Sequence, residues 1–239
     1  EDIHLVNPPK KEYTPVPAKN VTFRDNKIKG FSNENNVRII YLQGREVNSK
    51  KYYLENIRII SNNFLNCYDD SLGVRNAYSD LIYADCVIGL TVSENNCKKV
   101  RRLLYAEYIK KAKILNNIFD GAYWTPINVN DSEDVTAFNN TVERFGGGFY
   151  FRAVKKLNVN NNTFATGFPE AADSYLNIIA VNNCSRFAVK DNDFSDVATS
   201  PYKSIGVYGA SSTGFVRDNI ITGVSSGTVS ADSTGVVVS

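Results

Sequence analysis

The 239-residue chain carries 27 basic and 25 acidic residues, a net charge of +2, spread along its whole length. Such a balance offers no cationic surface for nucleic acid or for an anionic membrane, so we expect neither partner. No apolar run reaches the roughly 20 residues that crossing a bilayer requires, so membrane insertion is not expected either. The sequence lacks methionine and does not begin like a signal peptide, which favours a segment of a longer chain.

Asparagine, valine and isoleucine dominate the composition, with 29, 24 and 18 residues against only 12 leucines. β-Branched residues favour pleated strands and asparagine favours tight turns, so this mixture predicts an all-β fold. The four cysteines lack the spacing of a zinc site or of a disulfide framework, and we expect buried thiols. Neither a metal nor a cofactor is expected.

In chain order, the first element is residues 1–19, which contain four prolines and are predicted to form an extended lead-in. Residues 20–239 are predicted to form one domain, because a single motif recurs there eight times. The motif reads apolar, any, apolar, any, polar, Asn, any, apolar. Its asparagines are Asn26, Asn62, Asn95, Asn117, Asn140, Asn162, Asn192 and Asn219.

The motif predicts a β-strand with one buried face that ends at a corner. The positions three residues before and two residues after the asparagine are apolar in every copy, and period-two spacing is typical of strands. The residue before the asparagine is always polar, and asparagine tolerates the left-handed conformation that a sharp corner needs. We expect the asparagines to stack at successive corners and to hydrogen-bond one another.

A second strand precedes each motif at a constant distance, with inward pairs such as Leu104 with Ala106 and Phe149 with Phe151. Successive asparagines lie 22 to 36 residues apart, so the coil has about 22 residues, and the longer spacings contain insertions. The insertions are predicted to lie between the asparagine and the next second strand, on one side of the rod. The sequence therefore predicts a right-handed parallel β-helix of about eight coils.

A leucine-rich repeat has the same motif spacing and is the rival interpretation. Against it, leucine is scarce, and the segments 124–129 and 146–151 contain Gly or Pro with period-two alternation. Such segments are not suited to the helical side of a leucine-rich repeat.

With its 22-residue coils, its asparagine corners and its one-sided insertions, the chain resembles the parallel β-helices of pectate-lyase-like proteins, including bacteriophage tailspikes and tail appendages. The resemblance covers roughly residues 20–239. It implies binding and cleavage of a bacterial surface polysaccharide, a homotrimer, and a location on a virion tail or outside the cell. The alternatives are a structural or adhesive shaft that only recognises glycan, and a secreted polysaccharide lyase.

The outward positions of the second strand form two columns that match the chemistry of a sugar. The first column is read as Tyr83, Tyr105, Asn128, Tyr150 and Ala180, with Tyr208 joining it after a shift of one residue. The second column is read as Asp85, Glu107, Asn130, Arg152 and Asn182. Tyrosine rings suit the apolar face of a sugar, and carboxylates, amides and arginine suit its hydroxyl groups. The predicted substrate-binding residues are Tyr83, Tyr105, Tyr150, Arg152, Trp124 and Asn128.

The variable loops are expected to wall the same side of the rod, with Tyr68, Asp69, Asp70, Tyr123, Trp124, Glu170, Asp173 and Tyr175. The opposite interpretation is that tyrosines cover the exposed pleats of any parallel sheet.

Asp85 and Glu107 are the predicted catalytic residues. If the two acids are neighbours in register, their repulsion raises the pKa of one and provides an acid and a base for glycoside hydrolysis. A β-elimination would instead use Tyr105 or Tyr150 with Arg152. Calcium at Asp69 and Asp70, or at Asp131 and Asp134, is a weaker alternative to solvated acids.

Overall fold

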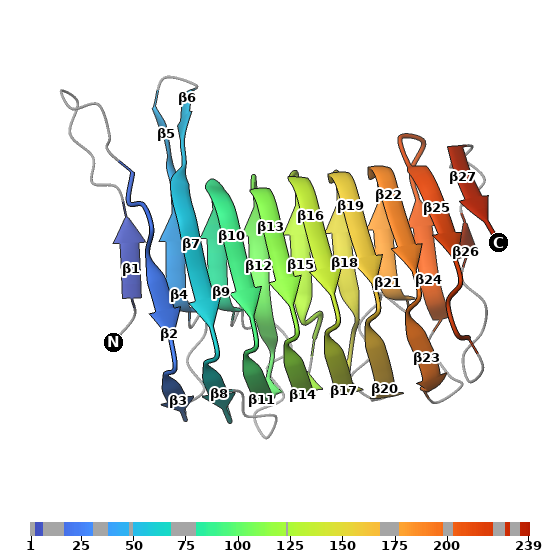
Figure 1. Cartoon of the computed structure of the whole chain (residues 1–239), viewed down its shortest axis with the longest axis horizontal. Helices are drawn as coiled ribbons and strands as arrows, with labels where there is room; N and C mark the ends of the chain where they lie inside the picture. The colour runs from blue at the N-terminus through green and yellow to red at the C-terminus, as the bar shows by residue number, and fades with distance from the viewer. Residues whose placement is uncertain are drawn as a thin grey trace.

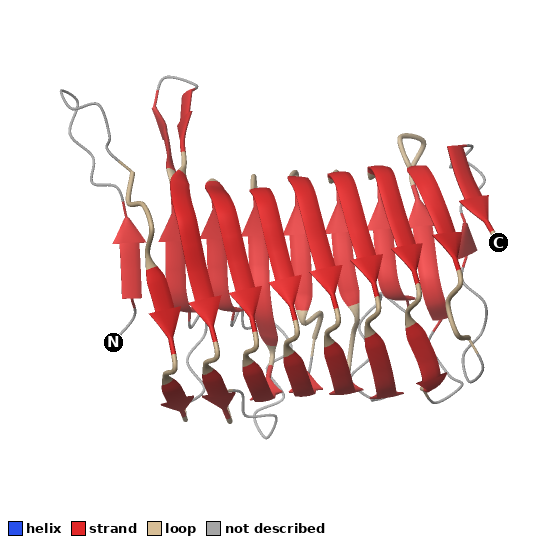
Figure 2. Cartoon of the chain, viewed as in Figure 1, coloured by secondary structure: helices blue, strands red, loops and turns tan. Residues whose placement is uncertain are grey.

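The computed structural model describes residues 3–6, 17–30, 38–47, 50–67, 80–122, 124–167, 177–197, 203–221, 228–229 and 235–239. The chain is a right-handed parallel β-helix, as predicted, and every regular element of the described residues is a strand (Figures 1 and 2). Each coil runs along one sheet, turns a corner onto the second, continues into a shorter third sheet and returns (Figure 1). The described residues include no helix long and apolar enough to cross a membrane.

Three parallel sheets form the walls of the rod. Sheet A contains β1 (Ile3–Val6), β4 (Arg38–Gln43), β9 (Asp80–Asp85), β12 (Arg102–Glu107), β15 (Ile127–Asn130), β18 (Phe149–Arg152), β21 (Asn177–Asn182), β24 (Lys203–Tyr208) and β26 (Thr228–Val229). Sheet B contains β2 (Thr22–Arg24), β7 (Leu54–Ile60), β10 (Val87–Ser93), β13 (Lys110–Leu115), β16 (Glu133–Phe138), β19 (Lys155–Asn160), β22 (Ser185–Lys190), β25 (Thr213–Arg217) and β27 (Gly235–Val238). Sheet C contains β3 (Lys27–Lys29), β8 (Asn63–Leu65), β11 (Asn96–Val100), β14 (Ile118–Ala122), β17 (Thr141–Phe145), β20 (Thr163–Gly167) and β23 (Asp193–Asp196).

Sheet A is built from the strands predicted to precede each motif, and sheet B from the motif strands themselves. Sheet C is built from the short strands that follow the motif asparagines. Within the lead-in of residues 1–19, Ile3–Val6 forms β1 and pairs in parallel with β4, so this part of the lead-in extends sheet A.

The core is a continuous apolar column inside the three sheets. The inward pairs of sheet A, such as Leu104 with Ala106 and Phe149 with Phe151, are at most 3% exposed. Aromatic rings from sheet C continue the packing, and Phe164 and Phe194 stack with ring centroids 5.2 Å apart. The four cysteines are free and buried, as expected. Each coil thus buries its apolar face within its own cross-section and against its two neighbours, and the rings of Phe149 and Phe164 of one coil are 5.0 Å apart.

The eight motif asparagines form one continuous ladder at the corner between sheets B and C, as predicted. In each step the Oδ1 of one asparagine accepts two hydrogen bonds from the asparagine of the preceding coil. One comes from the backbone N–H, at 3.0 or 3.1 Å, and one from Nδ2, at 2.9 or 3.0 Å. Nδ2 also donates to a backbone carbonyl of the preceding coil, for example from Asn117 to Val92 at 3.0 Å. The six asparagines from Asn62 to Asn192 are at most 1% exposed, so the ladder satisfies polar groups that water does not reach.

The left-handed residue at this corner is the polar residue before each ladder asparagine, not the asparagine itself. Asn116, Asn139 and Asn161, for example, have φ values of 55°, 53° and 53°. This division of roles explains the polar column of the sequence, because the preceding residue makes the turn and leaves the asparagine side chain to point inward.

One insertion lies on a side of the rod where none was predicted. β5 (Arg45–Val47) and β6 (Lys50–Tyr52) form an antiparallel hairpin between β4 of sheet A and β7 of sheet B. It projects from the body of the rod near its amino-terminal end (Figure 1). Gly44 at its base has no space for a side chain, since an added Cβ would lie 2.4 Å from the carbonyl oxygen of Tyr52 and 2.6 Å from the Cβ of Cys86.

Candidate functional site

The outer face of sheet A carries a stack of three tyrosines, which we call the tyrosine ribbon: Tyr41, Tyr83 and Tyr105. The three residues are in register on β4, β9 and β12. Their ring centroids are 5.0 Å and 5.7 Å apart, with interplanar angles of 17° and 7°. Each ring is half-buried, so the ribbon keeps an apolar edge towards solvent.

Tyr41 was missed from the sequence because the hairpin separates it from the next motif by more residues than in the other coils. The alternation of Ile40, Tyr41 and Leu42 is the same as that of Ile82, Tyr83 and Ala84, and it was the available signal. The inference that Tyr208 joins this column is wrong. Tyr208 pairs with Asn182 and lies in the second column, and Gly206 occupies the tyrosine position.

The remaining members of the first column do not extend the stack. Asn128 lies between Tyr105 and Tyr150 in register, so Tyr150 is separated from the ribbon by one strand. The Oδ1 of Asn128 accepts a hydrogen bond of 2.9 Å from Nδ2 of Asn130. Asn128 thus ends the aromatic stack and continues the face with an amide.

Asp85 and Glu107 are direct neighbours along one side of the ribbon, two residues after Tyr83 and Tyr105 and in register on β9 and β12. The hydroxyl of Tyr105 donates a hydrogen bond to Oε1 of Glu107. Burial and the charge of Glu107 raise the pKa of Asp85, while the Cys86 hydrogen bond and Lys51 oppose the rise. Oδ1 of Asp85 is buried and, among the described residues, accepts no hydrogen bond. The two carboxyl groups therefore differ, because one is held by a tyrosine and the other retains its proton more strongly than usual.

The acid pair and the ribbon form one electrostatic unit. Burial raises the pKa of Tyr83 to about 12, and the charges of Asp85 and Glu107 add to this effect. Next along the second column comes Asn130, and then Arg152, which is exposed. Arg152 forms an ion pair of 3.4 Å with Asp131 and is two strands away from Tyr105.

Arginines along the opposite side of the ribbon form a second charged group that the sequence did not reveal. Arg38, Asp80 and Arg102 are in register at the starts of β4, β9 and β12, and Arg102 forms an ion pair of 3.0 Å with Asp80. The Arg38 guanidinium lies over the ring of Tyr83, 4.0 Å from its centroid. Arg102 is 6% exposed, and its Nε finds no acceptor among the residues that the structure describes. The ribbon thus has cations along one side and carboxyl groups along the other.

Trp124 lies on the side of the ribbon that carries the arginines. Its ring centroid is 4.0 Å from Arg101 and 5.3 Å from Arg102, so the tryptophan packs on the two arginines. The predicted loop residues Tyr68, Asp69, Asp70, Tyr123, Glu170, Asp173 and Tyr175 lie outside the described residues.

Asp131 and Asp134, the second pair considered for calcium, each form an ion pair with a basic side chain. Asp131 faces Arg152, and Asp134 forms an ion pair of 2.9 Å with Lys156. Within the described ranges, no group of three potential metal ligands occurs.

The raised pKa of Asp85 predicts a specific dependence of stability on pH. Because the folded state binds this proton more tightly than the unfolded state, its contribution is present below the usual value of 3.8 and is lost as pH rises through the raised pKa. We expect Asp85→Asn to remove this part of the dependence, so that the variant gains stability relative to wild type as pH rises. Urea unfolding of both proteins between about pH 3 and pH 7 measures the difference. Parallel curves would show that the Asp85 carboxyl titrates normally.

With the geometry in hand, comparison with known proteins adds no relative. No protein-family model matches the chain, and no curated protein or solved structure matches it significantly. The functional argument therefore rests on the site itself.

Proposed function

We propose that the protein binds a bacterial surface polysaccharide along the outer face of sheet A and cleaves it with Asp85 and Glu107. The observation that carries the proposal is the tyrosine ribbon with an in-register acid pair along its side. Successive rings repeat at about the spacing of the strands, about 4.8 Å. Flat, half-exposed rings with flanking charges match the apolar faces and hydroxyl rims of consecutive sugars.

The two acids support hydrolysis with retention of configuration. Side chains in register on neighbouring strands start about 4.8 Å apart, which suits the roughly 5 Å separation of a nucleophile and an acid. The Glu107 carboxylate attacks the anomeric carbon while the bond to the leaving oxygen breaks, and Asp85 gives its proton to that oxygen. Water then attacks the glycosyl-enzyme, Asp85 takes its proton, and Glu107 is released. Tyr105 orients Glu107 through its hydrogen bond.

The geometry favours hydrolysis over β-elimination. The hydroxyl of Tyr105 is hydrogen-bonded to Glu107, and Arg152 is two strands away from Tyr105. Tyr150 is on the same strand as Arg152, but its hydroxyl accepts a hydrogen bond of 3.4 Å from Nδ2 of Asn182, and Arg152 is paired with Asp131. A non-catalytic shaft that only recognises glycan is the remaining candidate, since the ribbon by itself explains binding. From the resemblance of the repeat to tailspike-type β-helices we also propose a homotrimer on a virion tail or outside the cell.

A panel of capsule, O-antigen and teichoic acid preparations tests the proposed function. Release of new reducing ends indicates hydrolysis, and a rise in ultraviolet absorbance from unsaturated uronate indicates elimination. Binding without either product would show that the protein is an adhesin. Absence of binding to every capsule, O-antigen and teichoic acid of the panel would contradict the proposal.

Tyr83→Ala is expected to weaken polysaccharide binding about fivefold, since one aromatic stacking contact contributes about 1 kcal/mol. The rod should stay folded, because the Tyr83 side chain faces outward and is only half-buried. Thr136→Ala is the matched control, as Thr136 is an equally half-buried outward residue on β16 of sheet B. Calorimetric titration of each variant with the polysaccharide that the wild-type protein binds measures the two affinities. Equal affinities for the two variants would mean that the tyrosines only cover the pleats of the sheet.

A further inference from the structure

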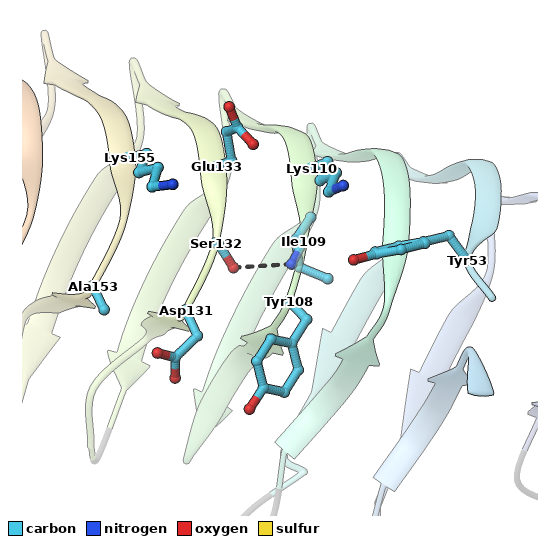
Figure 3. A pocket seen from close by; sticks show the side chains of 9 residues that line it. All are labelled: Tyr53, Tyr108, Ile109, Lys110, Asp131, Ser132, Glu133, Ala153 and Lys155. Atoms are coloured by element: carbon cyan, nitrogen blue, oxygen red, sulfur yellow. Dashed lines mark hydrogen bonds between the residues drawn. The ribbon is translucent and has the colours of Figure 1, made fainter. Parts of the chain in front are cut away.

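A pocket of about 260 Å³ lies at the corner between sheets A and B, next to the strand ends that carry Asp85 and Glu107, and we call it the corner pocket. Six side chains that project into or around it are Tyr53, Tyr108, Lys110, Asp131, Glu133 and Lys155 (Figure 3). Its floor is closed by the hydrogen bond from the Ile109 N–H to Ser132 Oγ, at 3.0 Å. Ligand pockets for drug-sized molecules begin at about 300 Å³, so this volume suits one sugar ring.

Tyr108 occupies the corner in a conformation that bulky residues avoid. Its φ is 53°, and its side chain is 40% exposed. The same corner position in other coils is also left-handed but carries smaller residues: Cys86, Asp131, Ala153 and Asn183. A large aromatic side chain in this region is strained, and such strain concentrates at functional sites. Packing does not explain the tyrosine, because its ring is not buried.

The charges around the pocket sum to a positive value. Lys110, Glu133 and Lys155 are in register on β13, β16 and β19, and within the described part of the chain none of them is in an ion pair. Asp131 is compensated by Arg152. Two lysines therefore face one uncompensated carboxylate, and Lys51 of the hairpin adds another cation over the Tyr108 ring.

The rings and one lysine converge on one side of the pocket. Lys110 follows Tyr108 by two residues, and its Nζ lies 4.9 Å from the centroid of the Tyr53 ring. Tyr53 and Tyr108 both line the cavity, as does Lys110 (Figure 3). A sugar ring packed on Tyr108 would place an anionic substituent beside Lys110, with Glu133 free to accept hydrogen bonds from hydroxyl groups.

We propose that the corner pocket binds a single hexose-sized sugar that carries a negative charge, with its ring on Tyr108 and its anionic group at Lys110. The site is separate from the ribbon and needs no cleavage, so it goes beyond the proposed function. A carboxylate and a phosphate share this chemistry, and the choice of probes distinguishes them.

Nuclear magnetic resonance titration of the whole chain with D-glucuronate, glucose 6-phosphate and glucose tests the proposal. At least one anionic sugar should bind more tightly than glucose, and which one identifies the group. Tyr108→Asn should weaken that binding about fivefold, the loss expected for one stacking contact. Asparagine occupies this corner at Asn183, so the variant should fold and melt at an equal or higher temperature.

Lys110→Gln should abolish the preference for the anionic sugar, whereas Lys113→Gln should not change it. Lys113 is the matched control because it is an exposed lysine on the same strand outside the pocket. Tyr83→Ala should leave this binding unchanged, which separates the corner pocket from the ribbon. Equal binding of glucose and both anions, unchanged binding by Tyr108→Asn, or loss of binding by Tyr83→Ala would each overturn the assignment.

Discussion

Asn140→Ala is expected to lower the free energy of unfolding by about 3–5 kcal/mol, because it orphans several buried groups at about 1–3 kcal/mol each. Oδ1 of Asn140 accepts hydrogen bonds from the N–H and the Nδ2 of Asn117, at 3.0 Å and 2.9 Å. Its Nδ2 donates to the carbonyl of Ile114 at 3.0 Å and to Oδ1 of Asn162 at 2.9 Å. Asn140 is 1% exposed, so water cannot replace these partners. Urea denaturation followed by circular dichroism measures the loss.

Asn26→Ala provides the matched control, since it is the same substitution at the end of the same ladder. Asn26 is only partly buried, and among the described residues nothing donates to its Oδ1. Its removal should therefore cost less than about 1 kcal/mol. If Asn140→Ala and Asn26→Ala are equally mild, the ladder does not satisfy otherwise orphaned backbone groups, and the repeat must be stabilised by apolar packing alone.

Glu107→Gln is expected to reduce polysaccharide cleavage by about 10⁶-fold, the loss typical of removing the nucleophile of a covalent hydrolase. The amide keeps the size of the side chain and still accepts the hydrogen bond from Tyr105, but it cannot act as a nucleophile. Binding of the polysaccharide should therefore survive. Initial rates of reducing-end release and calorimetric affinities, measured on the same preparation, separate the two effects.

The control for Glu107→Gln is Glu143→Gln, because Glu143 is an exposed acid on β17 of sheet C, far from the ribbon in the cross-section of the coil. Its cleavage rate should equal that of wild type. Full activity of Glu107→Gln would remove Glu107 from catalysis, and the reaction would then have to be sought outside the acid pair. Loss of binding together with cleavage would mean that Glu107 mainly contacts the sugar.

The coil was predictable from the sequence because each of its determinants is local and repeated. Period-two apolar residues define which face is buried, and the asparagine marks the same corner in each coil. The in-register pairing of Asp85 with Glu107 followed from these constant distances, as did the alignment of Tyr83 with Tyr105. In a regular repeat, the spacing of residues in the sequence thus predicts which residues are neighbours on adjacent strands.

In the irregular coils, the spacing in the sequence did not predict the neighbours on adjacent strands. The β5–β6 hairpin hid Tyr41 from the column, and the longer corner between β24 and β25 placed Tyr208 beside Asn182. Insertions change the counting distance but not the sheet pairing, because hydrogen bonding between neighbouring strands decides the register.

The charged surroundings of the site were decided only by the tertiary structure. Arg38, Asp80 and Arg102 are 22 or more residues apart and meet because coils stack, and no local pattern marks them. The raised pKa of Asp85 comes from burial, which depends on everything that covers the residue. The corner pocket likewise combines Tyr53, Tyr108 and Asp131 from different coils. The sequence by itself determined the strands, the corners and the order of the coils, whereas exposure, charge compensation and cavity shape required the packed molecule, because they depend on distances between residues of different coils.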